Sequence, residues 1–479
     1  MTVATKPERS ARPLIVDLDG TLVPIDLLVE QFASVASKDW RAALGTLAEL
    51  RRGKSALKTA VAKSSELQPA LLPYDPAVIA LVRKARDEGR PVYLATASHQ
   101  LQAEAIARHL GLFDGVFATT ADVNLAGTAK AELLVEQFGE GGFDYVGNHS
   151  HDLDVWKHAH TAFAVRTSAS VRRRLKSLGV RSEIVEARRS GVPDWIRALR
   201  VHQYSKNLLI FVPLLAGHAH LLAQWLAASM MFVAFCLAAS SAYLLNDLLD
   251  LEADRQHPTK AFRPLASGAI STQGALAAIP ILLLSAVAIG VLVSPLCLLV
   301  LGGYLLLTLG YSLYLKRRML VDVVALALLY TVRIIAGSVA SGITPSEWLL
   351  AFSLFAFSSL AIIKRYTEVA GRLDRNLVDI SHRNYRKEDL VILASLAAAT
   401  GTNAVTVFAM YVNSPAVTQL YSHPKLLWLI CPLLLYLLGR ALMVSNRREM
   451  HDDPVVWALR DRICRIGLFV SALIALAAL

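Results

Sequence analysis

The sequence predicts a two-part protein, an α/β domain followed by an all-helical membrane domain. Three observations support this division of the 479 residues. A chain of this length exceeds the usual size of one domain. Up to about residue 200, short apolar runs alternate with helical patterns, and none is long enough to cross a bilayer. Beyond that point, runs of about twenty apolar residues recur to the C-terminus, the length that a membrane-spanning helix requires.

Charge and cysteine usage exclude several classes of function. The formal net charge is +11. Beyond residue 200 the basic residues cluster between apolar runs, which indicates membrane orientation, so we expect no nucleic-acid partner. The four cysteines lie in or beside apolar runs without CxxC spacing, which favours buried apolar residues over a disulfide or zinc site. The first twenty residues contain no apolar signal region, so no signal peptide is expected.

The N-terminal domain is predicted to span residues 1–190. Strand-like runs at 13–16, 90–96 and 143–147 each end in polar residues, and in open α/β sheets chemistry gathers at the carboxyl ends of strands. Between and after them, residues 77–89, 101–110 and 131–138 have helical patterns. The amphipathic segment at about 27–75 is predicted to form a small helical cap.

Four ordered motifs in this domain resemble those of the haloacid dehalogenase (HAD) superfamily of phosphohydrolases. They are the DxDGT at 17–21, the hydroxyl-ended strand at 90–98, Lys130 within Gly-Thr-Ala-Lys, and the segment 143–152. The resemblance implies a Rossmann-like sheet and an aspartyl-phosphate mechanism, in which a carboxylate attacks phosphorus and a second carboxylate moves the proton. The implied residues are the nucleophile Asp17, the acid–base Asp19, the phosphate ligands Thr96 and Lys130, and the Mg²⁺ ligands Asp17, Asp19, Asn148 and Asp152. The family usually has aspartate where Asn148 stands, so a structural or regulatory HAD domain stays open.

Residues 191–204 are predicted to form an interfacial linker helix, with Trp195 and Tyr204 at the headgroup level. Residues 205–479 contain about nine candidate spans. Loops at 247–271, 315–319, 365–389 and 446–461 hold most of the lysines and arginines, which predicts that these loops are cytoplasmic. We therefore expect an integral protein of the inner or plasma membrane, with the α/β domain on the cytoplasmic side and the C-terminus outside.

An acidic motif follows the second apolar run. Asp247, Asp250 and Asp254 are spaced i, i+3 and i+7, so one helix would place all three on one face. Such a cluster at the end of a buried helix is costly unless a cation neutralises it, and carboxylate oxygens suit Mg²⁺ shared with substrate phosphates. The alternative is a solvated acidic helix end. Lys260 and Arg263 follow, where they can bind phosphate oxygens.

The segments His202–Asn207, Asn246–Asp254, His257–Lys260 and Arg263–Gly268 resemble the UbiA superfamily of intramembrane prenyltransferases. The resemblance implies nine helices around a polar cavity. Most members carry a second DxxxD loop, whereas this chain has Lys-Arg-Tyr-Thr-Glu at 364–368, similar to the branch that transfers phosphoribose to polyprenyl phosphate. The implied metal and catalytic residues are Asp247, Asp250 and Asp254, and the implied substrate ligands are Lys206, Asn246, Lys260, Arg263, Lys316, Lys364, Arg365 and Glu368.

Together these patterns predict Mg²⁺-dependent transfer of 5-phosphoribose from phosphoribosyl pyrophosphate to a decaprenyl-type polyprenyl phosphate, followed by removal of the 5-phosphate by the HAD domain. One alternative is prenyl transfer from a prenyl diphosphate to an aromatic acceptor, beside a regulatory or degenerate HAD domain. Another is a membrane scaffold. Arg333, inside the fifth span, is either functional or paired with Asp322 or a helix carbonyl. Lipid length and a homo-oligomeric state stay open.

Overall fold

The fold was analysed in a computed structural model, which describes residues 12–120, 123–188, 190–373, 384–450 and 453–479. The chain divides into two compact units. The first comprises Met1–Leu199 and Tyr243–Ile279, and the second comprises Arg200–Ala242 and Pro280–Leu479. The segment with the acidic motif therefore belongs to the same unit as the α/β domain.

The α/β domain is built on a six-stranded sheet with every pair parallel. Its strands are β1 (Leu14–Val16), β2 (Val92–His99), β3 (Gly115–Thr119), β4 (Asp144–Gly147), β5 (Thr161–Val165) and β6 (Arg181–Val185), in the order β3-β2-β1-β4-β5-β6. Leu14 of β1 pairs with Val92 on one side and Asp144 on the other. The strand order reverses at β1, and in doubly wound sheets the binding site lies at this point. The predicted doubly wound fold is confirmed.

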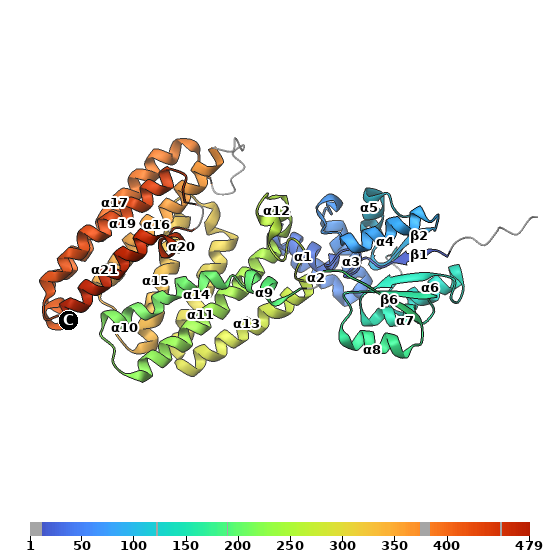
Figure 1. The fold of residues 1–479 in the computed structure, drawn as a ribbon, viewed down its shortest axis with the longest axis horizontal. Coiled ribbons are helices and arrows are strands. Elements are labelled where there is room, and N and C mark those ends of the chain that lie inside the picture. Colours follow the sequence, from blue (N-terminus) through green and yellow to red (C-terminus); the bar gives the residue numbers. More distant parts are fainter. Residues whose placement is uncertain (1–11, 121–122, 189, 374–383, 451–452) are drawn as a thin grey trace, which may run out of the picture. The chain divides into compact units, whose positions relative to one another are not determined.

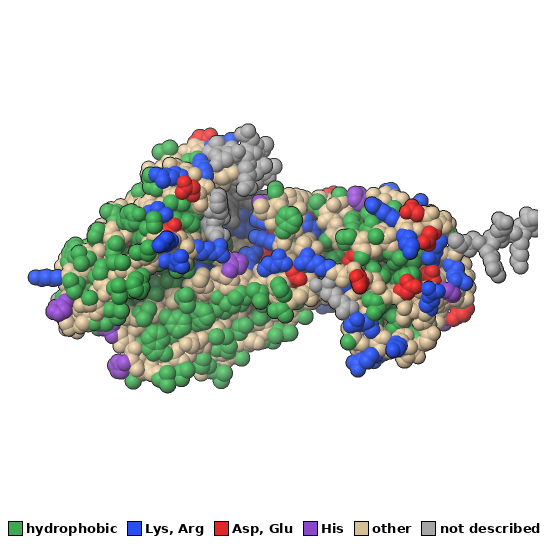
Figure 2. Space-filling view, viewed as in Figure 1, with side chains coloured by type: hydrophobic (Ala, Val, Ile, Leu, Met, Phe, Trp, Pro, Cys, Tyr) green, Lys and Arg blue, Asp and Glu red, His purple; other side chains and the backbone are tan. Residues whose placement is uncertain are grey.

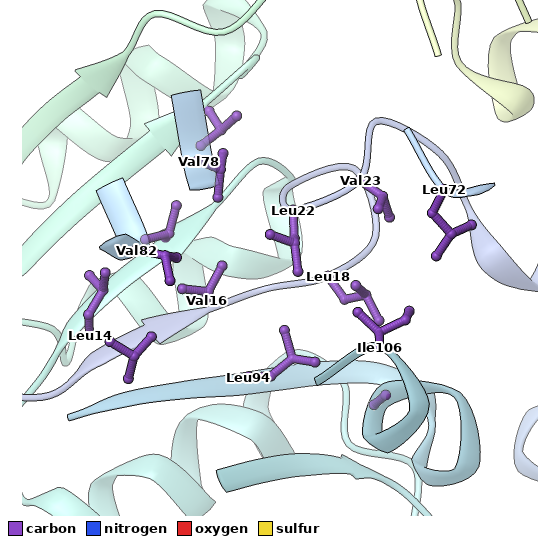
Figure 3. Close-up of a cluster of buried hydrophobic side chains, with 14 of the residues drawn as sticks. Leu14, Val16, Leu18, Leu22, Val23, Leu72, Val78, Val82, Leu94 and Ile106 are labelled. Carbon is purple, nitrogen blue, oxygen red and sulfur yellow. The ribbon is translucent and has the colours of Figure 1, made fainter. Parts of the chain in front are cut away.

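The sheet is held by apolar side chains packed between its strands and the flanking helices. Leu14 and Val16 of β1, Leu94 of β2 and Val78 and Val82 of α4 (Pro76–Asp87) are fully buried together, as Figure 3 shows. Parallel strands covered on both faces read as continuous apolar runs, which is the pattern seen here. Further helices are α5 (Gln100–Leu110), α6 (Thr128–Phe138), α7 (Leu153–Trp156), α8 (Ala169–Ser177) and α9 (Val192–Ala198). The predicted helical stretches therefore appear, with ends that differ by at most three residues.

The predicted cap segment is helical. It contains α1 (Leu27–Lys38), α2 (Trp40–Ala48), η1 (Glu49–Arg52), α3 (Lys54–Ser64) and η2 (Pro69–Leu71). Asp26 caps α1 by accepting a hydrogen bond from the Val29 amide, and Asp39 caps α2 through the Arg41 amide. Aspartate satisfies the unpaired N–H groups at a helix start in this way, which explains where both helices begin.

Seven helices in the described part of the chain are long and apolar enough to cross a membrane. They are α11 (Leu222–Leu249), α13 (Thr272–Val293), α14 (Pro295–Leu313), α15 (Val321–Ser341), α16 (Glu347–Leu373), α17 (Leu390–Val412) and η8 with α19 (Pro424–Asn446). Nine spans are thus not confirmed. The predicted span at 205–218 forms η4 (Val201–Phe211) and the short α10 (Val212–Ala216), and the one at 462–479 forms α21 (Arg462–Ala478), of 17 residues.

The helical unit exposes apolar side chains as a bilayer protein does. In its most apolar window α13 is only 11% buried, whereas α15 is 61% buried and packs against α14, α16, α10 and η4. Figure 1 shows the long helices, and Figure 2 shows hydrophobic side chains crowded over their surface. An apolar face of this extent is unfavourable in water and favourable in lipid. The chain is an integral membrane protein.

Candidate active sites

The first candidate site lies at the carboxyl end of β1. Asp17 directly follows this strand, and its Oδ1 lies 2.7 Å from the Nζ of Lys130, which α6 carries. Asp19 accepts hydrogen bonds at Oδ2 from Ser98 Oγ (2.6 Å) and Thr96 Oγ1 (3.3 Å) at the end of β2. The fold therefore brings together four residues predicted from three motifs, and adds Ser98.

Asp152 is the centre of the supporting network. Its Oδ2 accepts hydrogen bonds from the backbone N–H groups of Asn148 and His149, each at 2.8 Å. Its Oδ1 accepts from the hydroxyl of Tyr145 (2.9 Å), which in turn accepts from Lys130 Nζ (3.0 Å). Sequence reasoning missed Tyr145. The sequence does contain a signal for Tyr145, because a tyrosine in a buried strand needs a hydrogen-bond partner for its hydroxyl.

Two glycines allow the site loops to come close together. Gly20 has φ of +73°, and a Cβ there would lie 2.1 Å from Nδ2 of Asn148. A Cβ on Gly147 would lie 2.7 Å from the Asp152 carboxylate. A side chain at position 20 would push the β1 and β4 loops apart, and one at position 147 would displace the Asp152 carboxylate within the β4 segment. The DxDGT glycine is thus required both by its backbone conformation and by the neighbouring Asn148.

Burial controls the electrostatics of this site. Burial raises the pKa of Asp17 to about 7, even though the Lys130 ammonium group lowers it. Burial also raises the pKa of Asp19, and the carboxylate of Asp26 adds to this shift. Within the described residues, no three His, Cys, Asp or Glu side chains converge closely enough to hold a metal by themselves. The available donors are carboxylate and amide oxygens, which suit a Mg²⁺ ion that completes its shell with water and substrate.

Asn148 gives a direct test of metal binding here. Its Oδ1 accepts a hydrogen bond from Thr21 Oγ1 (3.3 Å), and the same hydroxyl lies 3.2 Å from Asp17 Oδ2. We expect Asn148→Asp to lower the Kd for Mg²⁺ about tenfold in a Mg²⁺ titration of the purified protein, because an added carboxylate charge at or beside a metal ligand changes metal affinity by about that factor. Asn148→Ala, which removes the oxygen, should raise it. Equal Kd values in the three proteins would exclude position 148 from the metal site.

The acidic motif forms a second candidate site in the same unit. The helix that was predicted to carry all three aspartates is not continuous, because α11 ends at Leu249 and α12 (Leu251–Gln256) begins after Asp250. Asp247 and Asp254 nevertheless meet, since Arg263 Nη1 lies 3.1 Å from Asp247 Oδ1 and 2.5 Å from Asp254 Oδ2. Asn246 Nδ2 donates to Asp250 Oδ2 (3.0 Å). Lys260 Nζ lies 3.8 Å from Asp254.

The position of Arg263 explains how this cluster is tolerated. Asp247 and Asp254 are both at least 95% buried, and two buried carboxylates need a compensating charge. One guanidinium nitrogen contacts both, so the two carboxylates are spaced to share a single cationic centre. The oxygen-only donor set fits Mg²⁺, and a metal held here would compete with Arg263 for the same oxygens.

Arg255, next to Asp254 on α12, attaches this helix to the cap. Arg255 Nη1 and Nη2 lie 2.8 and 2.7 Å from the two carboxylate oxygens of Glu30 on α1, and Arg255 Nε donates to the Ala266 carbonyl (2.9 Å). The Asp19 Oδ1 accepts a hydrogen bond from the Leu27 amide at the start of α1 (2.9 Å). Helix α1 therefore contacts a predicted catalytic residue at its start and the helix of Asp254 one turn later.

We expect Arg255→Ala to loosen residues 251–268 without unfolding the α/β sheet. Arg255 and Glu30 are each 8% exposed, and removing one partner of such a buried pair costs roughly 3–5 kcal/mol. Hydrogen exchange of the purified protein should be faster in 251–268 and unchanged in β1 and β4. Arg181→Ala, which removes an exposed pair with Glu183, is the matched control. Unchanged exchange in 251–268 would show that the pair does not hold this segment.

The second unit contains a basic cluster. Lys206 Nζ of η4 and Lys364 Nζ of α16 lie 2.9 and 2.8 Å from the same oxygen, Asp453 Oδ2, and Tyr330 donates to Asp453 Oδ1 (3.3 Å). Lys364, Asp453 and Tyr330 line a small cavity with Leu326 and Leu360. The fold thus brings together two predicted phosphate-binding lysines around an aspartate that sequence reasoning missed.

Other predicted residues of this unit lie in different surroundings. Arg365 is buried in ion pairs with Asp322 and Glu368, and its Nη2 donates to the Tyr311 hydroxyl (2.8 Å). A phosphate can reach this guanidinium only by displacing a carboxylate. Lys316 lies in η6 (Leu315–Arg317), between α14 and α15.

Arg333 takes the structural alternative that the sequence left open. Its Nε donates to Asn207 Oδ1 (2.7 Å), its Nη2 lies 3.3 Å from the Tyr304 hydroxyl, and its Nη1 bonds the Leu329 carbonyl of its own helix. Asp322 pairs with Arg365 instead. A guanidinium whose hydrogen bonds are met inside the protein is tolerated within the bilayer.

Asp453 predicts a pH dependence of stability. Burial raises the pKa of Asp453, but the ammonium groups of Lys364 and Lys206 together lower it by a larger amount. The pKa of Asp453 therefore lies well below its usual range. A depressed pKa contributes stability above the unfolded value of about 4 and loses it as the pH falls. We expect Asp453→Asn to cost roughly 3 kcal/mol at pH 7, from two lysines left unpaired, and progressively less as the pH falls below about 4. Thermal unfolding in detergent across this range measures it. A constant difference at all pH values would contradict the ion pairing.

Comparison with protein families agrees with these two architectures. Residues 208–460, more than half of the chain, match the model of the UbiA prenyltransferase family. The chain belongs to the UbiA prenyltransferase family. Residues 14–157 match the haloacid dehalogenase-like hydrolase model. Both resemblances seen in the sequence are thereby confirmed, and this UbiA family member carries an N-terminal HAD-like domain.

Three curated proteins are similar in sequence to this UbiA family member. A Sinorhizobium fredii protein, described as uncharacterized protein y4nM, is 38% identical over 469 residues, which cover 97% of this chain and 90% of that one. Nodulation protein NoeC of Azorhizobium caulinodans is 33% identical, over 57% of this chain and 90% of its own length. Decaprenyl-phosphate phosphoribosyltransferase of Mycobacterium tuberculosis is 37% identical over 184 residues, which cover 36% of this chain and 59% of that one.

Proposed function

We propose that this UbiA family member transfers 5-phosphoribose from phosphoribosyl pyrophosphate to a polyprenyl phosphate of the decaprenyl type, and that its HAD domain then removes the 5-phosphate. The observation that carries the first step is the Lys206–Asp453–Lys364 cluster. Two ammonium groups share one carboxylate, which leaves a net positive charge and lysine donors suited to a phosphate. The likeness to a decaprenyl-phosphate phosphoribosyltransferase supports phosphoribosyl transfer to such a lipid.

The absence of a second acidic loop argues against a prenyl diphosphate donor. In the segment 364–368 the structure pairs Arg365 with Asp322 and Glu368, so the one acid of this segment already neutralises a buried cation. A carboxylate used in this way is not a ready ligand for a second Mg²⁺. Phosphoribosyl pyrophosphate carries a further phosphate group, on O5 of ribose, and therefore fits a site with added lysines better.

In the proposed transfer, an oxygen of the polyprenyl phosphate attacks C1 of the ribose. The bond between C1 and the diphosphate oxygen breaks, and the electron pair leaves with the diphosphate. Lys260 and Arg263 bind the departing phosphate oxygens, for which Arg263 has to turn from its two aspartates. Mg²⁺ on Asp247, Asp250 and Asp254 would neutralise the charge that develops on the diphosphate.

In the proposed hydrolysis, Asp17 attacks the phosphorus of the 5-phosphate while Asp19 gives a proton to the departing O5 of ribose. Water then attacks the aspartyl-phosphate, Asp19 takes up its proton, and inorganic phosphate leaves. Lys130 and Thr96 bind the phosphoryl oxygens. Ser98 and the Leu27 amide hold Asp19 in place, since each donates a hydrogen bond to its carboxylate.

We further propose that the HAD domain and both sites face the cytoplasm in the inner or plasma membrane, with the C-terminus outside. The basic residues in the sequence of the loops at 247–271, 315–319, 365–389 and 446–461 support this orientation. Fusion of the two activities raises the effective concentration of the lipid intermediate at the phosphatase, without a new binding contact.

A donor screen tests the first step. Protein in lipid vesicles receives Mg²⁺, polyprenyl phosphate and labelled phosphoribosyl pyrophosphate, or a labelled prenyl diphosphate with an aromatic acid. The proposal expects label in the lipid fraction only with the ribosyl donor. Label in a prenylated aromatic product would establish the alternative, and no product from either donor would overturn the transferase assignment.

A further inference from the structure

Helix α2 of the cap presents its large apolar side chains outward. Trp40, Leu44 and Leu47 are spaced i, i+4 and i+7, and they are 63%, 56% and 45% exposed. The residues on the inward side are the small Ala43 and Thr46, both nearly buried. An ordinary surface helix buries its leucines and exposes its polar residues, so α2 is turned the opposite way. Leu50, in η1 just beyond, is 47% exposed and extends the same apolar surface.

The outward orientation is fixed by the packing of the cap. Asp39 caps α2, the Thr46 hydroxyl donates to the Ala43 carbonyl (2.8 Å), and α2 packs against α1 and α3, beside which it lies in Figure 1. Leu44, Leu47 and Leu50 line an open groove. Small inward residues let the helix lie close to its neighbours, so its leucines cannot turn inward without clashing. The packing of the cap therefore holds this apolar surface in its exposed position.

The rim of this surface is basic. Five basic and two acidic residues lie between Lys38 and Lys54, and Arg41, Arg51 and Arg52 are all exposed. An apolar helix face bordered by basic side chains is typical of an interfacial helix, which inserts its apolar residues below the headgroups and attracts anionic lipids. Because the helical unit of the same chain lies in a bilayer, a lipid surface is present at a high effective concentration. This favours lipid over a protein partner that is dilute in solution.

We propose that α2 and η1 of the cap dock on the anionic phospholipid surface of the membrane that holds the chain's own spans. Trp40, Leu44, Leu47 and Leu50 enter the headgroup and upper acyl region, and the arginines bind lipid phosphates. The cap then rests where a lipid-linked phosphate emerges from the bilayer. The inference concerns the binding surface and holds whichever reaction the HAD domain performs.

The test places an environment-sensitive fluorophore on α2. Leu47→Cys is labelled in a Cys431→Ser background, since the other three native cysteines are buried. The full-length protein is reconstituted in vesicles of three parts zwitterionic to one part anionic phospholipid. We expect quenching by nitroxide groups on the lipid acyl chains and protection from aqueous iodide. Leu101→Cys, on α5 and 53% exposed, is the matched control and should respond only to iodide.

Two results would contradict docking on lipid. Equal iodide quenching at positions 47 and 101 would overturn the proposal, and protection from both quenchers would show a protein contact in place of lipid. Changing Arg41, Arg51 and Arg52 to glutamine should reduce lipid quenching at position 47 several-fold, as should raised salt, because basic residues near an anionic surface attract it electrostatically and salt screens that attraction. Leu44→Cys provides a second labelling position should the first variant fold poorly.

Discussion

Asp247→Asn is expected to reduce phosphoribosyl transfer by about a hundredfold to a thousandfold while leaving phosphatase activity unchanged. The change removes a buried negative charge and leaves Arg263 with Asp254 as its remaining carboxylate in this cluster. Loss of a group that stabilises a developing leaving-group charge costs about 3–4 kcal/mol in the transition state, which corresponds to this factor. Transfer is measured as label from the ribosyl donor in extracted lipid, and phosphatase activity as release from a soluble phosphate ester.

The matched control for this variant is Glu252→Gln. Glu252 lies on the other face of α12, where its carboxylate accepts hydrogen bonds from Ser34 (3.2 Å) and Gln68 (3.0 Å) of the cap. Its loss alters the same helix without touching the aspartate cluster, so transfer should stay within a few-fold of the native rate. If Asp247→Asn retained a tenth of native transfer, the acidic motif would not hold the leaving group.

Asp17→Asn is expected to abolish phosphate release, by at least about a thousandfold, because removal of a covalent nucleophile stops the chemistry that depends on it. Lipid that carries both ribose and its 5-phosphate should accumulate at an unchanged rate of transfer. Release of inorganic phosphate from this lipid measures the effect directly.

Two controls make the Asp17 result interpretable. The variant leaves the buried Lys130 without its 2.7 Å partner, so thermal unfolding must first show that the domain is folded. Asp87→Asn, at the exposed end of α4, should change neither activity. Undiminished phosphate release from Asp17→Asn would mean that the HAD domain does not use this carboxylate.

The first site followed largely from the sequence because of how parallel sheets are built. Asp17, Asp19 and Thr96 each come at the end of a predicted strand, and the carboxyl ends of adjacent parallel strands meet at one edge. The edge strands were not predicted. Residues 165–187 include a run of basic residues at 172–176, which favours a single basic helix, whereas they contain the end of β5, α8 and β6. Strand β6 is mostly exposed and carries charged residues, so it lacks the apolar run that marks a buried strand.

The charge pairing of the helical unit was not accessible from sequence. Asp453 lies 247 residues from Lys206 and 89 from Lys364, and no local pattern links them. The partner of Arg365 across the fold is Asp322, which had been considered for Arg333. The break of the helix at Asp250 was also missed, because i, i+3 and i+7 spacing fits a continuous helix equally well. Tertiary packing decides such pairings, whereas the sequence shows only the spacing of residues within a motif.

The order of the two lipid products tests the central claim most directly. Native protein in vesicles receives polyprenyl phosphate, Mg²⁺ and a pulse of ribose-labelled phosphoribosyl pyrophosphate, and the lipids are analysed by mass over time. We predict that the lipid with phosphorylated ribose appears first and then declines as the lipid with unphosphorylated ribose rises. In Asp17→Asn the first lipid should persist. A phosphorylated lipid that never converts in the native protein, or a conversion that Asp17→Asn does not stop, would contradict two consecutive reactions in one chain.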